Sequence, residues 1–209
     1  MFYKYLRQYE LLYGNHFYLD KNFSELHYNH SNVKNGNIND DLDKRLSESC
    51  NTCRKFSARK KIVYGHGVSE PEIFIILESP SEIDIHKDKL LSGLPGKLFD
   101  KILIAINRKR KKDVYISSIL KYKLDNNRDP LASDISNCIE HLNKKINIMK
   151  PKLILLLGNV VAKLLLQKGN KVNDFRNKTY HYNKIPTFIT YHPASLIRDE
   201  KLKLLVWQD

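Results

Sequence analysis

From about residue 60 onward, the chain alternates between continuously apolar runs and longer segments whose apolar residues recur every three or four positions. The first kind, such as EIFIILES (72–79) and PKLILLLG (151–158), is typical of β-strands buried on both faces. The second kind, such as residues 131–149, is typical of amphipathic helices. The alternation predicts an α/β fold, with a central, mostly parallel sheet between two helical layers.

The same pattern predicts the other elements of this part of the chain. The further predicted strands are KKIVYG (60–65), DVYISSILKY (113–122), KTYHYN (178–183) and IPTFITY (185–191). The further predicted helices are residues 96–109, residues 159–169 and a final helix that carries Trp207.

The chain before residue 50 has a different character. Aromatic and apolar residues of segment 2–17 fall near a period of 3.6, which predicts an aromatic-rich helix. Residues 29–41 contain five asparagines and no apolar pattern, as in a flexible linker. A short helix is predicted for 41–52. We therefore predict a helical extension (1–28), a linker (29–41) and one domain (42–209).

Charge adds a candidate partner. The formal net charge is +13, and all of the excess lies in residues 50–209, which carry 30 basic and 16 acidic residues. A basic globular body suits a polyanion such as DNA. General enrichment in Lys and Asn through an AT-rich genome is the alternative explanation. Since no apolar run approaches the roughly 20 residues of a membrane span and the N-terminus lacks a secretory pattern, we expect a cytoplasmic protein.

Polar and small residues follow four of the predicted strands. These residues are Glu78, Ser118, Gly158 and His192. In a parallel sheet, functional groups gather at the carboxyl ends of the strands, so the four positions are expected to share one edge. His192 is followed directly by Pro193, which limits the turn after the strand.

Several motifs together carry a resemblance to a known family. They are a Cys-x-x-Cys pair (Cys50, Cys53) before YGHG, then DVYISSILKYKLDNNRDP, NCIEHLNKKINIMKPKLILLLG and TYHPASLIR. Over roughly residues 50–207 the chain resembles the family 4, iron–sulfur type of uracil-DNA glycosylase. The N-terminal segment is similar to the leader of alphaproteobacterial members.

The resemblance implies a DNA repair hydrolase that acts on uracil in double- or single-stranded DNA, as a monomer. Such an enzyme swings the nucleotide out of the helix and hydrolyses its N-glycosidic bond, which leaves an abasic site. His192 matches the histidine that stabilises the uracil anion, and Glu78 is the candidate for positioning the water. The implied substrate- and DNA-binding residues are Ser79, Leu91, Ser118, Asn127, Ser195, Leu196 as the wedge, and Arg198 as a phosphate contact.

Several matched positions depart from the family pattern. Leu77 and Ser81 replace glycines of a loop that approaches uracil. Leu91 stands where the family has a phenylalanine that stacks on the base, and Ser118 where it has an asparagine that reads the base. A hydroxyl has a shorter reach than an amide and a smaller hydrogen-bonding repertoire. The departures raise two alternatives: a glycosylase for another base, and a DNA-binding homologue without catalysis.

The cysteines match three of the four thiolates that normally hold a [4Fe–4S] cluster. Cys50, Cys53 and Cys138 are the three, and Tyr122 stands at the fourth position. Two alternatives are a purely structural Cys138 in the core of its helix and a zinc site completed by His141 or His66. A metal-binding protein unconnected with nucleic acid is the remaining functional class.

Overall fold

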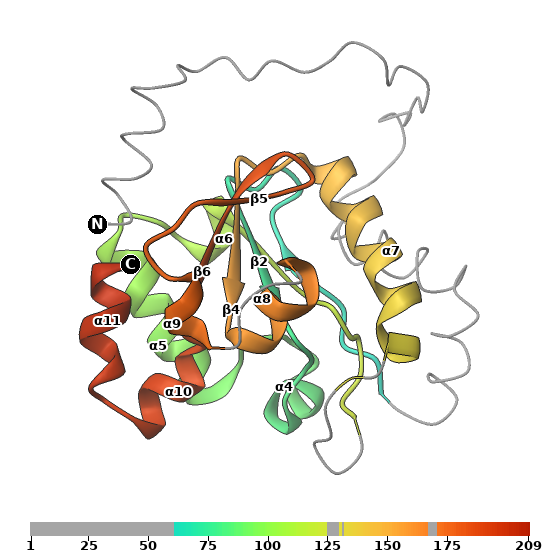
Figure 1. The fold of residues 1–209 in the computed structure, drawn as a ribbon. Coiled ribbons are helices and arrows are strands. Elements are labelled where there is room, and N and C mark those ends of the chain that lie inside the picture. Colours follow the sequence, from blue (N-terminus) through green and yellow to red (C-terminus); the bar gives the residue numbers. More distant parts are fainter. Residues whose placement is uncertain (1–60, 125–129, 131, 167–170) are drawn as a thin grey trace.

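The computed structural model describes residues 61–124, 130, 132–166 and 171–209, and Figure 1 draws the rest of the chain as a thin grey trace. The predicted N-terminal helix, the linker and the helix at 41–52 lie outside the described residues. So do Cys50, Cys53 and Asn127.

A sheet of six strands, in the order β1-β3-β2-β4-β6-β5, forms the middle of the described structure. The four inner strands run parallel: β3 (Val114–Ser118), β2 (Ile73–Leu77), β4 (Leu153–Leu157) and β6 (Ile185–Thr190). The edge strands β1 (His66–Gly67) and β5 (Tyr180–Tyr182) are antiparallel to their neighbours. The predicted mostly parallel sheet is therefore confirmed.

Helices cover both faces of this sheet (Figure 1). Their bounds are α4 (Glu82–Lys87), α5 (Gly93–Ala105), α6 (Arg110–Asp113), α7 (Ala132–Met149), α8 (Asn159–Leu166), α9 (Val172–Phe175), α10 (Pro193–Arg198) and α11 (Leu202–Gln208). Residues of α7, α8 and α9 pack into one apolar cluster, and residues of α5 pack into a second. Neighbouring residues of β2 belong to different clusters: Phe74 to the first and Ile75 to the second. Because successive strand residues point to opposite faces, the sheet separates the two clusters as the middle of three layers.

Some boundaries differ from the predictions. The predicted strand 60–65 is wrong for its described part, since 61–65 pair in no strand and β1 is only His66–Gly67. The predicted helix 96–109 begins earlier, at Gly93, and ends at Ala105. The short helix α4 was not predicted at all. None of the helices in the described ranges is long and apolar enough to cross a membrane.

Candidate active site at the carboxyl edge of the sheet

His192 caps the short helix α10 at the point where β6 ends. Its Nδ1 accepts a hydrogen bond from the Ala194 N–H at 3.1 Å, and Pro193 occupies the first helical position. Proline suits that position because its fixed φ is helical and its missing N–H would be unpaired anyway. With Nδ1 acting as acceptor, the hydrogen of the neutral ring lies on Nε2. The ring therefore presents one N–H donor.

The surroundings of His192 keep its ring uncharged. Burial lowers the pKa of His192 from 6.5 to about 4, with a smaller lowering from Arg198 and an opposing influence from Asp84. At neutral pH the side chain is consequently an imidazole that donates from Nε2, and not an imidazolium.

A glycine follows the neighbouring strand β4 close to His192. Gly158 follows β4, has φ +104° and donates its N–H to the Thr190 carbonyl at 2.9 Å. A Cβ at this position would lie 3.8 Å from the His192 Cβ. The left-handed φ, more than lack of space, requires glycine here.

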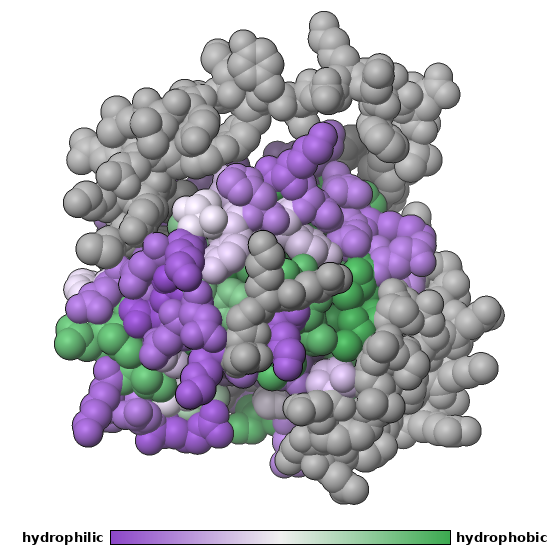
Figure 2. Space-filling view, in the orientation of Figure 1, coloured by the Kyte–Doolittle hydropathy of each residue, from purple (hydrophilic) through white to green (hydrophobic). Residues whose placement is uncertain are grey.

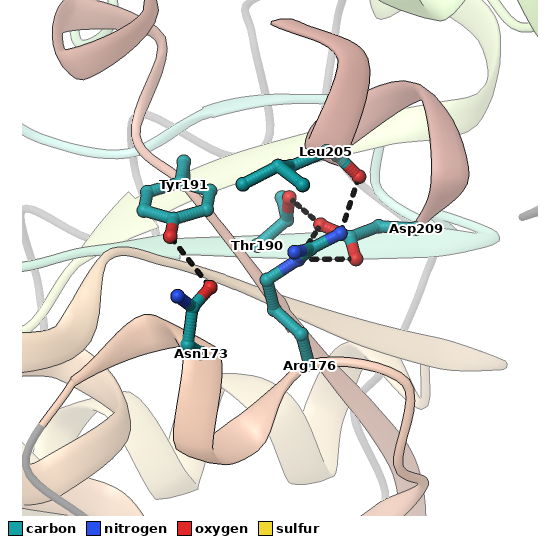
Figure 3. A network of polar contacts seen from close by, with 6 residues as sticks. All are labelled: Asn173, Arg176, Thr190, Tyr191, Leu205 and Asp209. Carbon is teal, nitrogen blue, oxygen red and sulfur yellow. Dashed lines mark hydrogen bonds and ion pairs between the residues drawn. The ribbon is translucent and has the colours of Figure 1, made fainter. Parts of the chain in front are cut away.

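The two residues before His192 are anchored to neighbouring helices (Figure 3). Thr190 Oγ1 donates to Asp209 Oδ2 at 2.6 Å, and Tyr191 Oη donates to Asn173 Oδ1 at 2.7 Å. Asp209 in turn forms an ion pair with Arg176, at 2.6 Å between Nε and Oδ1. The end of β6 is thereby attached to α9 and to the end of α11, which fixes the place from which the histidine projects.

The segment after β2 lies two strands away from His192 along the sheet. Glu78 and Ser79 are half-buried, and the Glu78 carbonyl accepts the Leu120 N–H at 2.9 Å. Ser81 then caps α4: its Oγ accepts the Asp84 N–H, and the Asp84 carboxylate accepts the Ser81 N–H. Asp84 is not among the residues predicted for the site, although the Ser-x-x-Asp pattern of a capping box indicates it.

A buried lysine forms hydrogen bonds with the last two residues of β3. Lys121 is buried, and its Nζ donates to Ser117 Oγ at 2.9 Å and to the Ser118 carbonyl at 2.6 Å. Ser118 is fully buried, and its Oγ has no hydrogen-bond partner within the described part of the chain. Its hydroxyl has unused hydrogen-bonding capacity at the position that the resemblance assigns to base reading.

Leu91 lies in a tightly built loop before α5. Its side chain is buried in the second apolar cluster, its φ is +52°, and its carbonyl accepts from Arg110 Nη1 at 3.2 Å. A Cβ at Gly96 would lie 2.0 Å from the Leu91 carbonyl oxygen, so only glycine fits there. The structure thus shows Leu91 as a packing residue, and contact with a base stays a prediction.

The residues of α10 differ in their exposure to solvent. Leu196, the expected wedge, is 2% exposed, whereas Ile197 is 42% exposed. A wedge must leave the protein and enter DNA, so the burial of Leu196 argues against that role. Arg198 is exposed, with Nη2 3.4 Å from Ser195 Oγ.

The candidate metal ligands are only partly described. Cys138 on α7 and Tyr122 are both buried in the first apolar cluster. His141, one turn after Cys138, has a buried Nδ1 without a partner among the described residues, and burial is the main cause of its lowered pKa. Both ring nitrogens of His66 on β1 are also buried without a partner among the described residues. Burial is the main cause that lowers the pKa of His66 to about 4. Within the described ranges, no three His, Cys, Asp or Glu side chains converge. Of the four expected cluster ligands, the described residues therefore supply only the Cys138 thiol and the Tyr122 phenol.

A mainly apolar cavity of about 310 Å³ lies between the sheet, α5 and α11. Its lining includes Leu196 but neither His192 nor Glu78, so this cavity is separate from the carboxyl edge of β2. Over α10 and α11 the surface is mainly hydrophilic, interrupted by hydrophobic residues (Figure 2). Two large apolar side chains of α11, Leu204 and Trp207, are exposed.

Comparison with known proteins identifies relatives of this chain. The family profile described as "Uracil DNA glycosylase superfamily" matches residues 64–209. The chain is 32% identical to the type-4 uracil-DNA glycosylase of Saccharolobus solfataricus over 180 residues, which is 81% of this chain and 83% of the relative. It is 30% identical to the type-4 enzyme of Pyrobaculum aerophilum, over 78% and 88% of the two chains. A DNA polymerase of Bacillus phage SP01 is 27% identical over 75% of this chain but only 17% of the polymerase.

Proposed function

The chain belongs to the uracil-DNA glycosylase superfamily, and on that premise we propose that it removes uracil from DNA by hydrolysing the N-glycosidic bond. The observation that carries the proposal is the neutral, half-buried His192, held at the carboxyl edge of the sheet with Nε2 as its N–H donor. Its activity would leave an abasic site for later steps of DNA repair.

The donor fits the charge that the reaction creates. When the bond between C1′ and uracil N1 breaks, its electron pair leaves with the base, so negative charge grows on uracil O2 while the sugar becomes cationic. A donor aimed at O2 is stronger in the transition state than in the ground state, and one such donor contributes about 3–4 kcal/mol. His192 provides it without a proton transfer.

A water must then add to C1′ and lose a proton, which ends on the departed uracil anion, directly or through solvent. We assign the orientation of this water to Glu78, which directly follows β2. Its backbone is held by the hydrogen bond from the Leu120 N–H, so the carboxylate starts from a fixed strand end. A carboxylate is an acceptor for both hydrogens of a nearby water.

The DNA side of the site is proposed to centre on α10. Ile197, and not Leu196, is the exposed apolar side chain and takes the role of wedge. Arg198 and Ser195, which lie next to it, would contact phosphate oxygens. Asn127 lies outside the described residues, and its contribution to DNA binding stays a prediction.

The choice of base is the finer part of the proposal. Ser118 offers one hydroxyl and Leu91 an apolar surface, with Ser79 in the half-buried segment after Glu78. The Ser118 Oγ, which has no partner among the described residues, favours one second candidate, a glycosylase with a different preferred base. A hydroxyl can both donate and accept, and so does not by itself select the edge of uracil.

We also propose that Cys50, Cys53 and Cys138 hold an iron–sulfur cluster, with Tyr122 at the fourth position. The shared burial of Cys138 and Tyr122 in one apolar cluster supports this assignment. Such a cluster would supply a structural cross-link and no chemical step. Anaerobically purified protein should contain iron and sulfide and absorb in the visible range, and Cys138→Ser should lower the iron content. Folded protein without iron would contradict the assignment.

The experiment for the main proposal uses duplexes with a single U·G or U·A pair and single strands with one uracil. Hypoxanthine and xanthine serve as alternative bases, and alkali reveals abasic sites by strand scission. We expect scission at uracil. Scission only at another base would establish the second candidate, and binding of DNA without any scission would show that catalysis is lost.

A further inference from the structure

Asp84 is a buried carboxylate at the carboxyl edge of β2, outside the motifs that carry the resemblance. It is 4% exposed and lies in the first turn of α4. Oδ2 accepts the Ser81 N–H at 3.0 Å, and Oδ1 accepts the Ser92 N–H at 2.7 Å. One side chain thereby connects the segment after β2 to the segment that enters α5.

Both connected segments carry groups that the proposed reaction uses. The first begins with Glu78, which is proposed to orient the attacking water. The second contains Leu91, next to Ser92 and at the position expected to meet the base. Since Arg110 holds the Leu91 carbonyl, the peptide unit between Leu91 and Ser92 is fixed from both sides. Such restraint is needed to keep a non-glycine residue at φ +52°.

Asp84 also lies within electrostatic reach of the third strand end. Two charged groups act on the His192 ring: Asp84 from α4 raises its pKa, and Arg198 from α10 lowers it, both less strongly than burial does. The carboxylate therefore acts on all three parts of the site, through hydrogen bonds on two of them and electrostatically on the third.

We propose that Asp84 is a positioning residue, which clamps the Glu78 and Leu91 segments around an extruded base and sets their place relative to His192. This inference rests on the proposed function. The clamp needs a carboxylate because two backbone N–H groups each require an acceptor oxygen. An asparagine has one such oxygen, and its amide nitrogen cannot accept.

The test compares Asp84→Asn with the matched control Glu82→Gln. Glu82 lies in the same turn of α4 and is exposed, and it pairs with Lys123. For Asp84→Asn we expect uracil excision in a single turnover to slow by about 10- to 100-fold, because small misplacements of reacting groups have effects of that order. Affinity for undamaged duplex should stay within about twofold, since the clamp contacts no phosphate. The control, Glu82→Gln, should match wild type in excision rate and in affinity for undamaged duplex.

Hydrogen–deuterium exchange tests the clamp without relying on activity. In Asp84→Asn, peptides that contain residues 79–84 and 89–93 should exchange faster than in wild type and in Glu82→Gln. Asp84→Glu keeps the charge and both acceptors, and should restore slow exchange and part of the rate. This variant carries the test if Asp84→Asn does not fold.

Three results separate the possibilities. An excision rate for Asp84→Asn within about twofold of wild type overturns the positioning role, whether or not exchange changes. Unchanged exchange overturns the clamp itself. If wild type excises no base at all, the proposed function fails, and faster exchange in Asp84→Asn would still support the clamp.

Discussion

At the scale of single residues, the position of one hydrogen on His192 decides what the site can do. The Ala194 N–H occupies Nδ1, so the remaining hydrogen of the neutral ring is on Nε2. The sequence could predict that an imidazole follows a buried strand, because IPTFITYHP shows both. It could not predict the tautomer, which depends on the turn geometry of α10.

The same residue should make stability depend on pH. The pKa of His192 is about 4 in the folded protein, below its ordinary value of 6.5, so between these values the unfolded chain binds more protons. Stability is therefore lost as the pH falls from 6.5 to 4, by about 3 kcal/mol for this ring. His66 adds a similar contribution in the same range.

Urea unfolding across this pH range checks the expectation. His192→Asn retains a residue suited to capping a helix and should show a weaker fall in unfolding free energy. His181→Asn changes an exposed histidine and serves as the control. Equal pH dependence in the two variants would contradict the neutral state of the half-buried His192.

A second residue-scale prediction separates neighbours on α10. Ile197→Ala removes an exposed side chain and should slow excision from duplex DNA more than from single strands, with little effect on stability. Leu196→Ala removes a buried side chain and should lower the free energy of unfolding by about 2–5 kcal/mol. The sequence cannot distinguish these neighbours, because a six-residue helix has too few apolar positions to define a face.

The two variants are compared by single-turnover excision on both substrates and by urea unfolding. A loss of duplex selectivity in Leu196→Ala, with none in Ile197→Ala, would restore Leu196 as the wedge.

At the scale of elements, the α11–α9–β6 contact is maintained by a buried ion pair. The side chains of Arg176 and Asp209 are 7% and 11% exposed, and Arg176 Nη2 also donates to the Leu205 carbonyl at 2.6 Å. Burial raises the pKa of Asp209, although its bonds to Thr190 and Arg176 oppose that change. The apolar pattern predicted the final helix, but residues 33 positions apart gave no sign of pairing.

Removing one partner of this pair should be costly. Arg176→Met leaves the Asp209 carboxylate buried without its cation, and we expect the free energy of unfolding to fall by about 3–5 kcal/mol. The control is Lys144→Met, which breaks the exposed pair with Glu140 on α7 and should cost less than about 1 kcal/mol. Similar losses in the two variants, measured by urea unfolding, would show that the buried pair does not hold α11 in place.

At the scale of the whole molecule, the sequence revealed the layered fold more clearly than the site. Runs such as LILLL in β4 are typical of strands covered on both faces, and their alternation with amphipathic segments predicts a parallel sheet between helices. The sequence did not show which side chains near the carboxyl edge of the sheet are buried. The motifs predict that Leu91 contacts the base and that Leu196 enters DNA, yet both side chains are buried by packing against α5 and the sheet. The capping-box pattern indicates the bond of Asp84 to the Ser81 N–H, but its bond to the Ser92 N–H has no signal in the sequence, because every residue except proline supplies such a group.

The most direct test of the account is the single-turnover rate of uracil release from a U·G duplex for wild type and His192→Ala, under conditions where both are folded and bind the duplex equally. A lost donor to the uracil anion should slow the wild-type reaction by about 100- to 1,000-fold. Excision by His192→Ala at the wild-type rate would contradict the role of this imidazole, and with it the mechanism proposed for the site.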